Sequence, residues 1–189
     1  GGTTGVRSSN GIGWKSPSVG GVALWAQSWM GENASTAAKV GNGNGFRITF
    51  DQGKFSAAYA DSSLTTGAGT TNKTSNLGAS YDLGVAKLMA QSNTTKLTGA
   101  ADIKGRNIGA LVPMAGGTFR VSQAQTDQAG KIAKQTSVGF VNPLSKRTDV
   151  YATYARVANS GGSATALNGA STAANASSTG YEFGIKHSF

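Results

Sequence analysis

Few side chains in this 189-residue sequence could do chemistry, and none belongs to a recognisable catalytic or metal-binding set. His187 is the single histidine and cysteine is absent, so neither a zinc site nor a thiolate nucleophile has a set of donors. A Ser-His-Asp triad would need partners for His187 that no motif supplies. The sequence therefore predicts a protein that is not an enzyme and that uses no metal and no cofactor.

The basic residues are the most informative charged group. There are 17 lysines and arginines against 8 acidic residues, which gives a net charge of +9. Because they are spread singly and not in runs or along helices, we expect no nucleic-acid partner. Several arginines instead share one property, in that each is expected to fall opposite the apolar face of its segment. These are Arg7, Arg47, Arg120 and Arg156.

Apolar and polar residues alternate through almost the whole chain, which predicts strands and not helices. In "GFRITF", for example, Phe46, Ile48 and Phe50 alternate with Arg47 and Thr49. Clusters of Gly, Asn and Ser separate eleven such segments, and we expect an all-β fold. The approximate spans of the segments are 6–16, 22–30, 45–50, 55–61, 74–81, 85–91, 103–112, 118–126, 134–141, 149–157 and 179–189.

The connections between these segments are expected to alternate in length. The short ones are residues 17–21, 51–54, 82–84, 114–117 and 142–148. The longer ones are residues 31–44, 62–73, 92–102, 127–133 and 158–178. Such alternation is typical of a transmembrane antiparallel β-barrel, which has short turns at one end and longer loops at the other. A soluble β-sandwich, such as an adhesin or a carbohydrate-binding protein, is the alternative, and its apolar face would form a packed core.

The residue types favour the barrel. Many apolar positions are alanine, and aromatic residues concentrate near the ends of the segments, as in a girdle at a membrane interface. The aromatic residues assigned in this way are Trp14, Trp29, Phe50, Phe55, Tyr81, Phe119, Tyr151, Tyr181 and Phe189. On this interpretation the arginines line an aqueous lumen, to which Lys15 and Lys186 add positive charge. A lumen of that sign favours anions.

Several segments resemble the general diffusion porins of Gram-negative bacteria, in their β-proteobacterial form. The resemblance covers residues from about 6 to 189. It is carried by "NGIGWKSPSVGGVALWAQSWMGE", "NLGASYDLGVAKLMAQ", "IGALVPMAGGTFRVSQAQ", "PLSKRTDVYATYARV" and "YEFGIKHSF". It implies a sixteen-stranded, homotrimeric, water-filled channel of the outer membrane, through which small hydrophilic solutes and ions diffuse. Its partners would be the lipid bilayer, lipopolysaccharide and small anionic solutes.

The resemblance also implies roles for single residues. Basic residues on the wall of such a channel face a loop that folds into the lumen, and the matching wall position in this chain is Arg7. The terminal Phe189 resembles the residue that the outer-membrane insertion machinery reads.

The strand count has a further consequence. Eleven is odd, whereas a bacterial barrel of this kind has an even number of strands. Because the family implies sixteen, we expect residues 1–189 to be the C-terminal part of a single porin barrel domain. Residues 1–5 would then end a constriction loop or an external loop, and the missing N-terminal portion would be a partner of this chain. A complete barrel of ten or twelve strands is the alternative.

Overall fold

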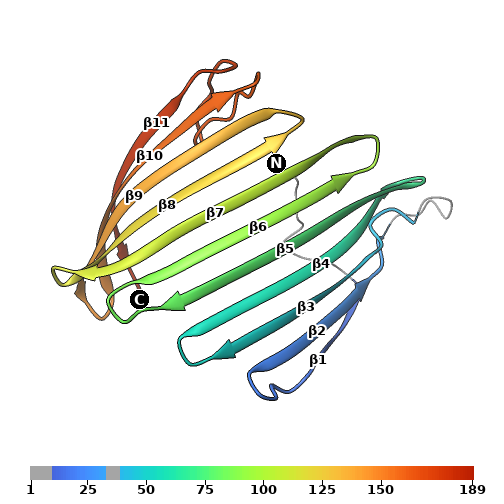
Figure 1. The fold of residues 1–189 in the computed structure, drawn as a ribbon, viewed down its shortest axis with the longest axis horizontal. Helices are drawn as coiled ribbons and strands as arrows, with labels where there is room; N and C mark the ends of the chain where they lie inside the picture. Colours follow the sequence, from blue (N-terminus) through green and yellow to red (C-terminus); the bar gives the residue numbers. More distant parts are fainter. Residues whose placement is uncertain (1–9, 33–38) are drawn as a thin grey trace. The chain divides into compact units, whose positions relative to one another are not determined.

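The computed structural model describes residues 10–32 and 39–189, and within these ranges it contains eleven strands and no helix (Figure 1). The strands are β1 (Gly11–Lys15), β2 (Val22–Trp29), β3 (Gly43–Gln52), β4 (Phe55–Gly67), β5 (Thr70–Asp82), β6 (Lys87–Leu97), β7 (Ala100–Met114), β8 (Gly117–Gln128), β9 (Lys131–Ser145), β10 (Thr148–Ser160) and β11 (Ser178–His187). The predicted all-β fold and the order of its eleven strands are confirmed. The first predicted segment began at residue 6, and residues 6–9 lie outside the described ranges.

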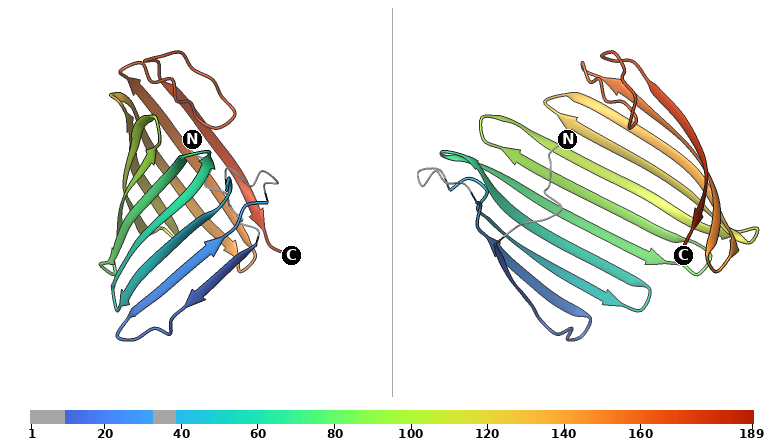
Figure 2. Two further views of the ribbon diagram at one scale, coloured as in Figure 1. Left: turned by 90° about the vertical axis from the view of Figure 1, so that its right-hand side faces the viewer. Right: turned by 180° about the vertical axis from the view of Figure 1, so that it is seen from behind.

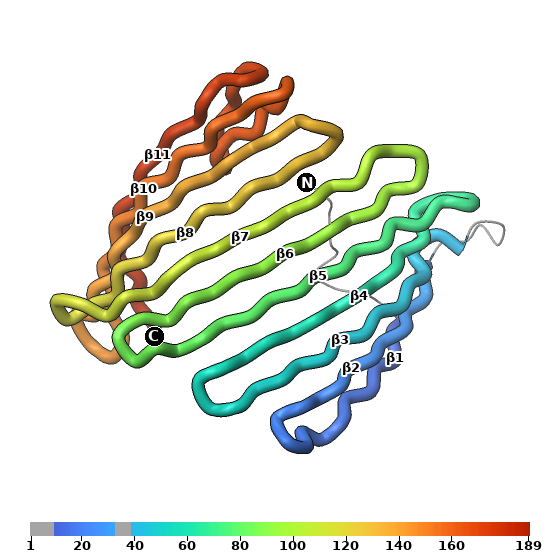
Figure 3. Tube along the Cα trace, viewed as in Figure 1, coloured from blue at the N-terminus to red at the C-terminus, as the bar shows by residue number. Residues whose placement is uncertain are grey.

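The strands follow one another in one sheet, in the order β1 to β11. The chain divides into two compact units, which we describe separately. The N-terminal unit holds the described residues up to Ala79 together with Ser92–Lys104, and its strands β1 to β4 pair antiparallel. The C-terminal unit holds Ser80–Gln91 and Gly105–Phe189, and its strands β8 to β11 also pair antiparallel (Figure 3).

Tight turns join many neighbouring strands. The turn between β8 and β9 consists of Ala129 and Gly130, whose φ angles are 53° and 82°. Two successive positive φ angles are typical of the type I′ turn, whose twist matches that of a hairpin. The Oδ1 atom of Asp127 accepts a hydrogen bond from the backbone N–H of Gly130 at 3.0 Å and so holds this turn closed.

The prediction of five longer connections is wrong for three of them. Most of residues 62–73, 92–102 and 127–133 continue the neighbouring strands, and the connections that remain are residues 68–69, 98–99 and 129–130. For residues 62–73 and 92–102 the physical reason is that threonine suits a pleated strand and its hydroxyl can bond across strands. For example, the Oγ1 atoms of Thr74 and Thr95 lie 3.4 Å apart.

The apolar side chains do not form a packed core. Among the described residues, only Ala133 and Val157 are buried hydrophobic side chains. By contrast, Ile12, Phe183 and Ile185 are 78%, 74% and 72% exposed. A β-sandwich buries its apolar face between two sheets, so the sandwich alternative does not fit this arrangement. The apolar face instead needs an apolar surrounding.

Candidate functional site

The register of β1 to β4 sorts the side chains of the N-terminal unit onto two faces, because residues opposite each other share a face. The apolar face of this unit carries Ile12, Trp14, Val22, Leu24, Ala26, Phe46, Ile48, Phe50, Phe55, Ala57 and Tyr59. The polar face carries Lys15, Trp25, Gln27, Arg47, Thr49, Asp51, Ser56 and Ser62. The predicted alternation in "GFRITF" is thus confirmed.

Two of the basic residues that the sequence predicted to line the lumen lie on this polar face, one on each side of a tryptophan. Trp25 of β2 lies opposite Lys15 of β1 on one side and opposite Arg47 of β3 on the other. We call Lys15, Trp25 and Arg47 the basic row. The guanidinium carbon of Arg47 lies 5.4 Å from the centroid of the Trp25 ring. This cation–π contact holds the positive charge of Arg47 in a fixed place above the sheet.

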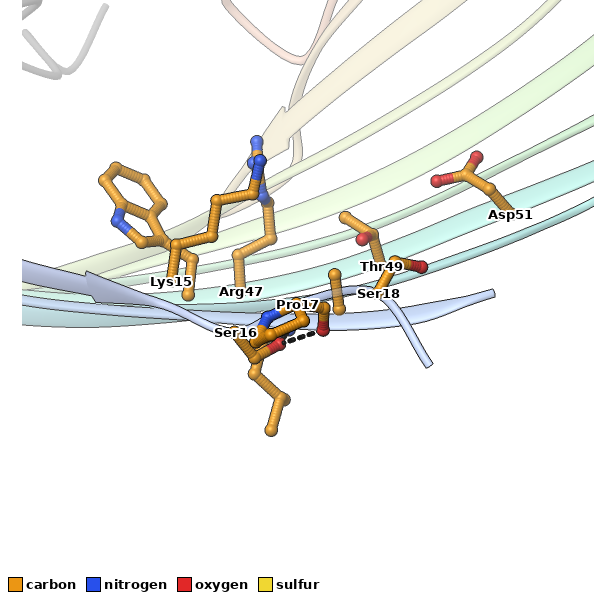
Figure 4. A pocket seen from close by; sticks show the side chains of 10 residues that line it. Lys15, Ser16, Pro17, Ser18, Arg47, Thr49 and Asp51 are labelled. Atoms are coloured by element: carbon orange, nitrogen blue, oxygen red, sulfur yellow. Dashed lines mark hydrogen bonds between the residues drawn. The ribbon is translucent and has the colours of Figure 1, made fainter. Parts of the chain in front are cut away.

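The basic row borders an open hollow of about 600 Å³. The hollow is lined by Lys15, Ser16, Pro17, Ser18, Ala23, Leu24, Trp25, Arg47, Thr49 and Asp51. Figure 4 shows Lys15 and Arg47 rising from the same side of the sheet, with Thr49 and Asp51 beside them on that side. Among the side chains that line this hollow, Lys15 and Arg47 are positively charged and Asp51 is negatively charged, so this part of the wall has a net positive charge.

The C-terminal unit also has a polar face. Two more of the basic residues that the sequence predicted to line the lumen lie on it. Arg120 is opposite Gly139, on the other side of the strand from Phe119 and Val121. Lys186 lies opposite Asp149, which brings opposite charges to neighbouring positions. The predicted polar orientation of Arg120 and Lys186 therefore agrees with the register.

The prediction for Arg156 is wrong. Arg156 lies opposite Thr179 of β11, and so shares the face of Tyr154, Phe183 and Ile185. This is the apolar face of the C-terminal unit, which also carries Phe119, Val121, Val138, Phe140, Ala152 and Tyr181. The error arises because β10 has apolar residues at both parities, so the partner strand decides its orientation.

Two aromatic residues expected on the apolar face lie instead on the polar faces. Trp29 lies opposite Gly43, and a Cβ atom on that glycine would come within 2.3 Å of the Trp29 ring. Tyr151 lies opposite Gly184, where a Cβ atom would come within 2.4 Å of the Tyr151 ring. Each ring therefore covers a glycine of the neighbouring strand. Tyr151 also donates a hydrogen bond from its hydroxyl to Glu182 Oε1 at 2.7 Å.

The remaining residues to which the sequence analysis gave a functional role, Arg7 and Phe189, lie near the ends of the chain. Arg7 falls outside the described residues. Phe189 is fully exposed, and its ring packs edge-on against His187 with 5.0 Å between centroids. The Nδ1 atom of His187 lies 2.9 Å from the Thr148 hydroxyl. His187 thus has a structural partner, and in the described part of the chain no three His, Cys, Asp or Glu side chains gather as a metal site would require.

The connection between β10 and β11, residues 161–177, folds back beside the ends of these strands (Figure 2), and it contacts Asn159 and Gly180 on the polar face of the C-terminal unit. Asn159 holds it, because its amide nitrogen donates to the carbonyls of Thr165 at 2.8 Å and Ala176 at 2.7 Å. Its Oδ1 atom accepts from the Ser163 hydroxyl at 2.8 Å. Val157, on the same face, is only 1% exposed. The connection is therefore an ordered cover over the ends of these strands.

Replacing Asn159 by alanine should loosen this connection. Each hydrogen bond contributes about 0.5–1.5 kcal/mol, so losing several should raise the open population of residues 161–177 about tenfold or more. The measurement is amide hydrogen exchange of this segment in the folded protein.

The matched control is Asn168→Ala in the same connection. Among the described residues the side chain of Asn168 makes no hydrogen bond, so its removal should leave the exchange rate nearly unchanged. Equal rates for the two variants would contradict the role of Asn159.

Sequence reasoning missed Trp25. The signal was present in "LWAQSW", where Trp25, Gln27 and Trp29 alternate with the apolar Leu24 and Ala26. A tryptophan is usually assigned to the apolar face, and only the register places this one between two cations.

Comparison with known proteins bears on the role of the apolar and polar faces. A family model described as Gram-negative porin matches residues 1–162. The chain belongs to this Gram-negative porin family. Outer membrane porin protein 32 of Delftia acidovorans is 32% identical over 202 residues, which cover 98% of the porin chain and 58% of the relative.

Solved structures agree with this assignment. The anion-selective porin from Comamonas acidovorans matches the porin chain with a TM-score of 0.90 and 31% identity, over 97% of this chain and 60% of that one. The outer membrane protein OmpT of Vibrio cholerae, in its trimer form, matches with a TM-score of 0.66. Because its identity is only 10%, with 94% of this chain and 64% of that chain covered, it supports the fold alone.

Two consequences follow from the family. The predicted fold class, a transmembrane antiparallel β-barrel, and the predicted outer-membrane location are confirmed. The porin chain spans about 60% of the length of these relatives. No helix in the described part of the chain is long and apolar enough to cross a membrane.

Proposed function

We propose that these strands form part of the wall of a water-filled outer-membrane channel that prefers anions. In this channel the apolar faces contact lipid and the polar faces contact water. The basic row is the observation that carries the proposal, because it places Lys15 and Arg47 together on the polar face around Trp25. Fixed positive charge on a pore wall attracts anions and repels cations.

The proposed work of the channel is passive diffusion and not catalysis. The substrates would be small anionic solutes, because the polar wall offers cations and hydroxyl groups. The relative from Comamonas acidovorans is described as anion-selective, which supports the same preference here. Arg120 adds a positive charge on the polar face of the C-terminal unit, where Lys186 lies opposite the carboxylate of Asp149. The ordered connection of residues 161–177 narrows the external mouth.

The family resemblance supports further proposals about the assembly. We expect the channel to be a homotrimer in the lipid bilayer, with lipopolysaccharide as its neighbour in the outer leaflet. The chain would supply the C-terminal strands, and a further, N-terminal portion would pair with the outer edges of β1 and β11. Paired edges are required because an open sheet edge does not occur in lipid. Phe189 would serve as the insertion signal, and Arg7 as a wall cation at the constriction.

Bilayer recordings test the channel. The complete protein, reconstituted in a planar bilayer under a KCl gradient, should show steady ohmic conductance with a reversal potential that favours chloride. A reversal potential that favours potassium would contradict the anion preference. Absence of conductance from a folded, inserted barrel would contradict the channel itself.

A further inference from the structure

The hollow beside the basic row carries opposite charges at its two ends. On the polar face of the N-terminal unit, Arg47, Thr49 and Asp51 follow one another at every second residue of β3. Four residues of a strand span about 13 Å, which separates the Cα atoms of Arg47 and Asp51. Figure 4 shows Thr49 between Arg47 and Asp51 on the same side of the sheet. The hollow is therefore dipolar along β3, with its positive end at the basic row.

Small side chains form the floor between these two ends. Thr49 lies opposite Ala23 of β2 on one side and opposite Ala58 of β4 on the other. A methyl group rises much less above a sheet than the side chains of Trp25 and Arg47 do, so this line of residues leaves room above it. The hollow of about 600 Å³ includes this space. A small solute could thus lie over Thr49 and reach both charged ends.

The charges at the two ends are not neutralised within the described part of the chain. In residues 10–32 and 39–189, neither the Lys15 side chain nor the Asp51 carboxylate makes a hydrogen bond or an ion pair. The neighbours of Asp51 across the strands are Gly21 and Ser56, which carry no charge. Lys15, Arg47 and Asp51 are all exposed. A solute in the hollow therefore meets both signs of charge.

We propose that this hollow binds zwitterionic amino-carboxylates whose two charged groups are separated by several bonds. The proposal rests on the proposed function, in which the polar face contacts water, and it adds a second class of solute to the small anions. The carboxylate of the solute binds Lys15 and Arg47, and its ammonium group binds Asp51. Arginine suits the first contact because its guanidinium offers a fork of N–H donors that matches a carboxylate.

The carboxylate of Asp51 selects this class of solute over a simple anion. A monoanion is attracted by Lys15 and Arg47 but is repelled by Asp51, and a dianion that spans the hollow places its second charge against Asp51. A zwitterion of sufficient length is attracted at both ends. Glycine is too short for this, because its two charges lie on neighbouring bonds whereas Arg47 and Asp51 are four residues apart.

The test measures the dissociation constants of three solutes by ligand-detected NMR, with the complete protein in lipid nanodiscs. The solutes are 5-aminopentanoate, pentanoate, which lacks the ammonium group, and glycine. Because an exposed ion pair contributes modestly, 5-aminopentanoate should bind about threefold more tightly than either of the others. Equal affinity for 5-aminopentanoate and pentanoate would overturn the proposal. Equal affinity for glycine would overturn the requirement for separated charges.

Asp51→Asn should remove the preference for 5-aminopentanoate over pentanoate, because it keeps the shape of the side chain and removes its charge. The matched control is Glu182→Gln, which removes the same charge from the polar face of the C-terminal unit. This control should keep the preference. A preference that survives Asp51→Asn, or that Glu182→Gln removes equally, would contradict a site at the hollow.

The reversal potential of the same proteins under a KCl gradient separates this proposal from the proposed function. A channel that prefers chloride but binds 5-aminopentanoate and pentanoate equally would refute only the zwitterion site. A preference for 5-aminopentanoate that depends on Asp51, in a channel without chloride preference, would refute only the proposed anion selectivity.

Discussion

Replacing Arg47 by glutamate should lower the preference of the complete channel for chloride over potassium by about tenfold. The substitution changes the wall charge by two units, and each unit charge at about 7 Å in water contributes ~0.6 kcal/mol before screening by salt. The effect acts with opposite sign on the two ions, so it enters the permeability ratio twice. Arg47→Glu also loses the contact with Trp25, which fixes the charge in the natural protein. The measurement is the reversal potential under a KCl gradient.

Arg156→Glu is the matched control for this prediction. It makes the same change of charge on a strand of the same sheet, but on the apolar face. We expect its reversal potential to stay close to that of the natural protein. Equal shifts for Arg47→Glu and Arg156→Glu would show that long-range net charge, and not the basic row, sets the selectivity.

Replacing Ala152 by arginine should destabilise the barrel in a lipid bilayer by about 2–4 kcal/mol, the cost of a charge on the lipid face near mid-depth. Ala152 lies on the apolar face of β10, between Phe140 of β9 and Phe183 of β11, and two residues along the strand from Tyr154. The guanidinium would have no water within reach except by bending toward the interface. The measurement is the free energy of unfolding by denaturant in vesicles.

The adjacent position supplies the control for Ala152→Arg. Thr153 lies on the polar face, opposite Gly139 and Glu182. Thr153→Arg adds the same side chain one residue away, and we expect it to cost less than about 1 kcal/mol because it faces water. A larger loss for Thr153→Arg than for Ala152→Arg would contradict the assignment of the two faces.

The sequence predicted the strands because alternation is a local signal. Phe46, Ile48 and Phe50 cannot share a face in a helix, so β3 was identified from its own residues. The orientation of β10 was not predictable in this way. Its apolar residues include Val150 and Tyr154 on one face and Val157 on the other, and only pairing with β11 assigns Arg156.

The length of the strands and the composition of the site also depend on non-local contacts. Threonine-rich and glycine-rich stretches such as residues 62–73 have the composition of loops, yet cross-strand bonds such as that between Thr66 and Thr70 make them strands. The basic row needs three strands in register before Lys15, Trp25 and Arg47 become neighbours. Sequence spacing predicted the polar orientation of Lys15 and Arg47, but it could not predict the tryptophan between them.

Thiol labelling tests most directly which face contacts water. The chain has no cysteine, so each introduced cysteine is its only thiol. Single variants Ile48→Cys, Thr49→Cys, Ala152→Cys and Thr153→Cys sample both faces of both units. In bilayers, a charged water-soluble thiol reagent should modify the cysteines at positions 49 and 153 rapidly and leave those at 48 and 152 protected. Rapid labelling at positions 48 and 152, with protection at 49 and 153, would contradict a polar face that lines a water-filled channel.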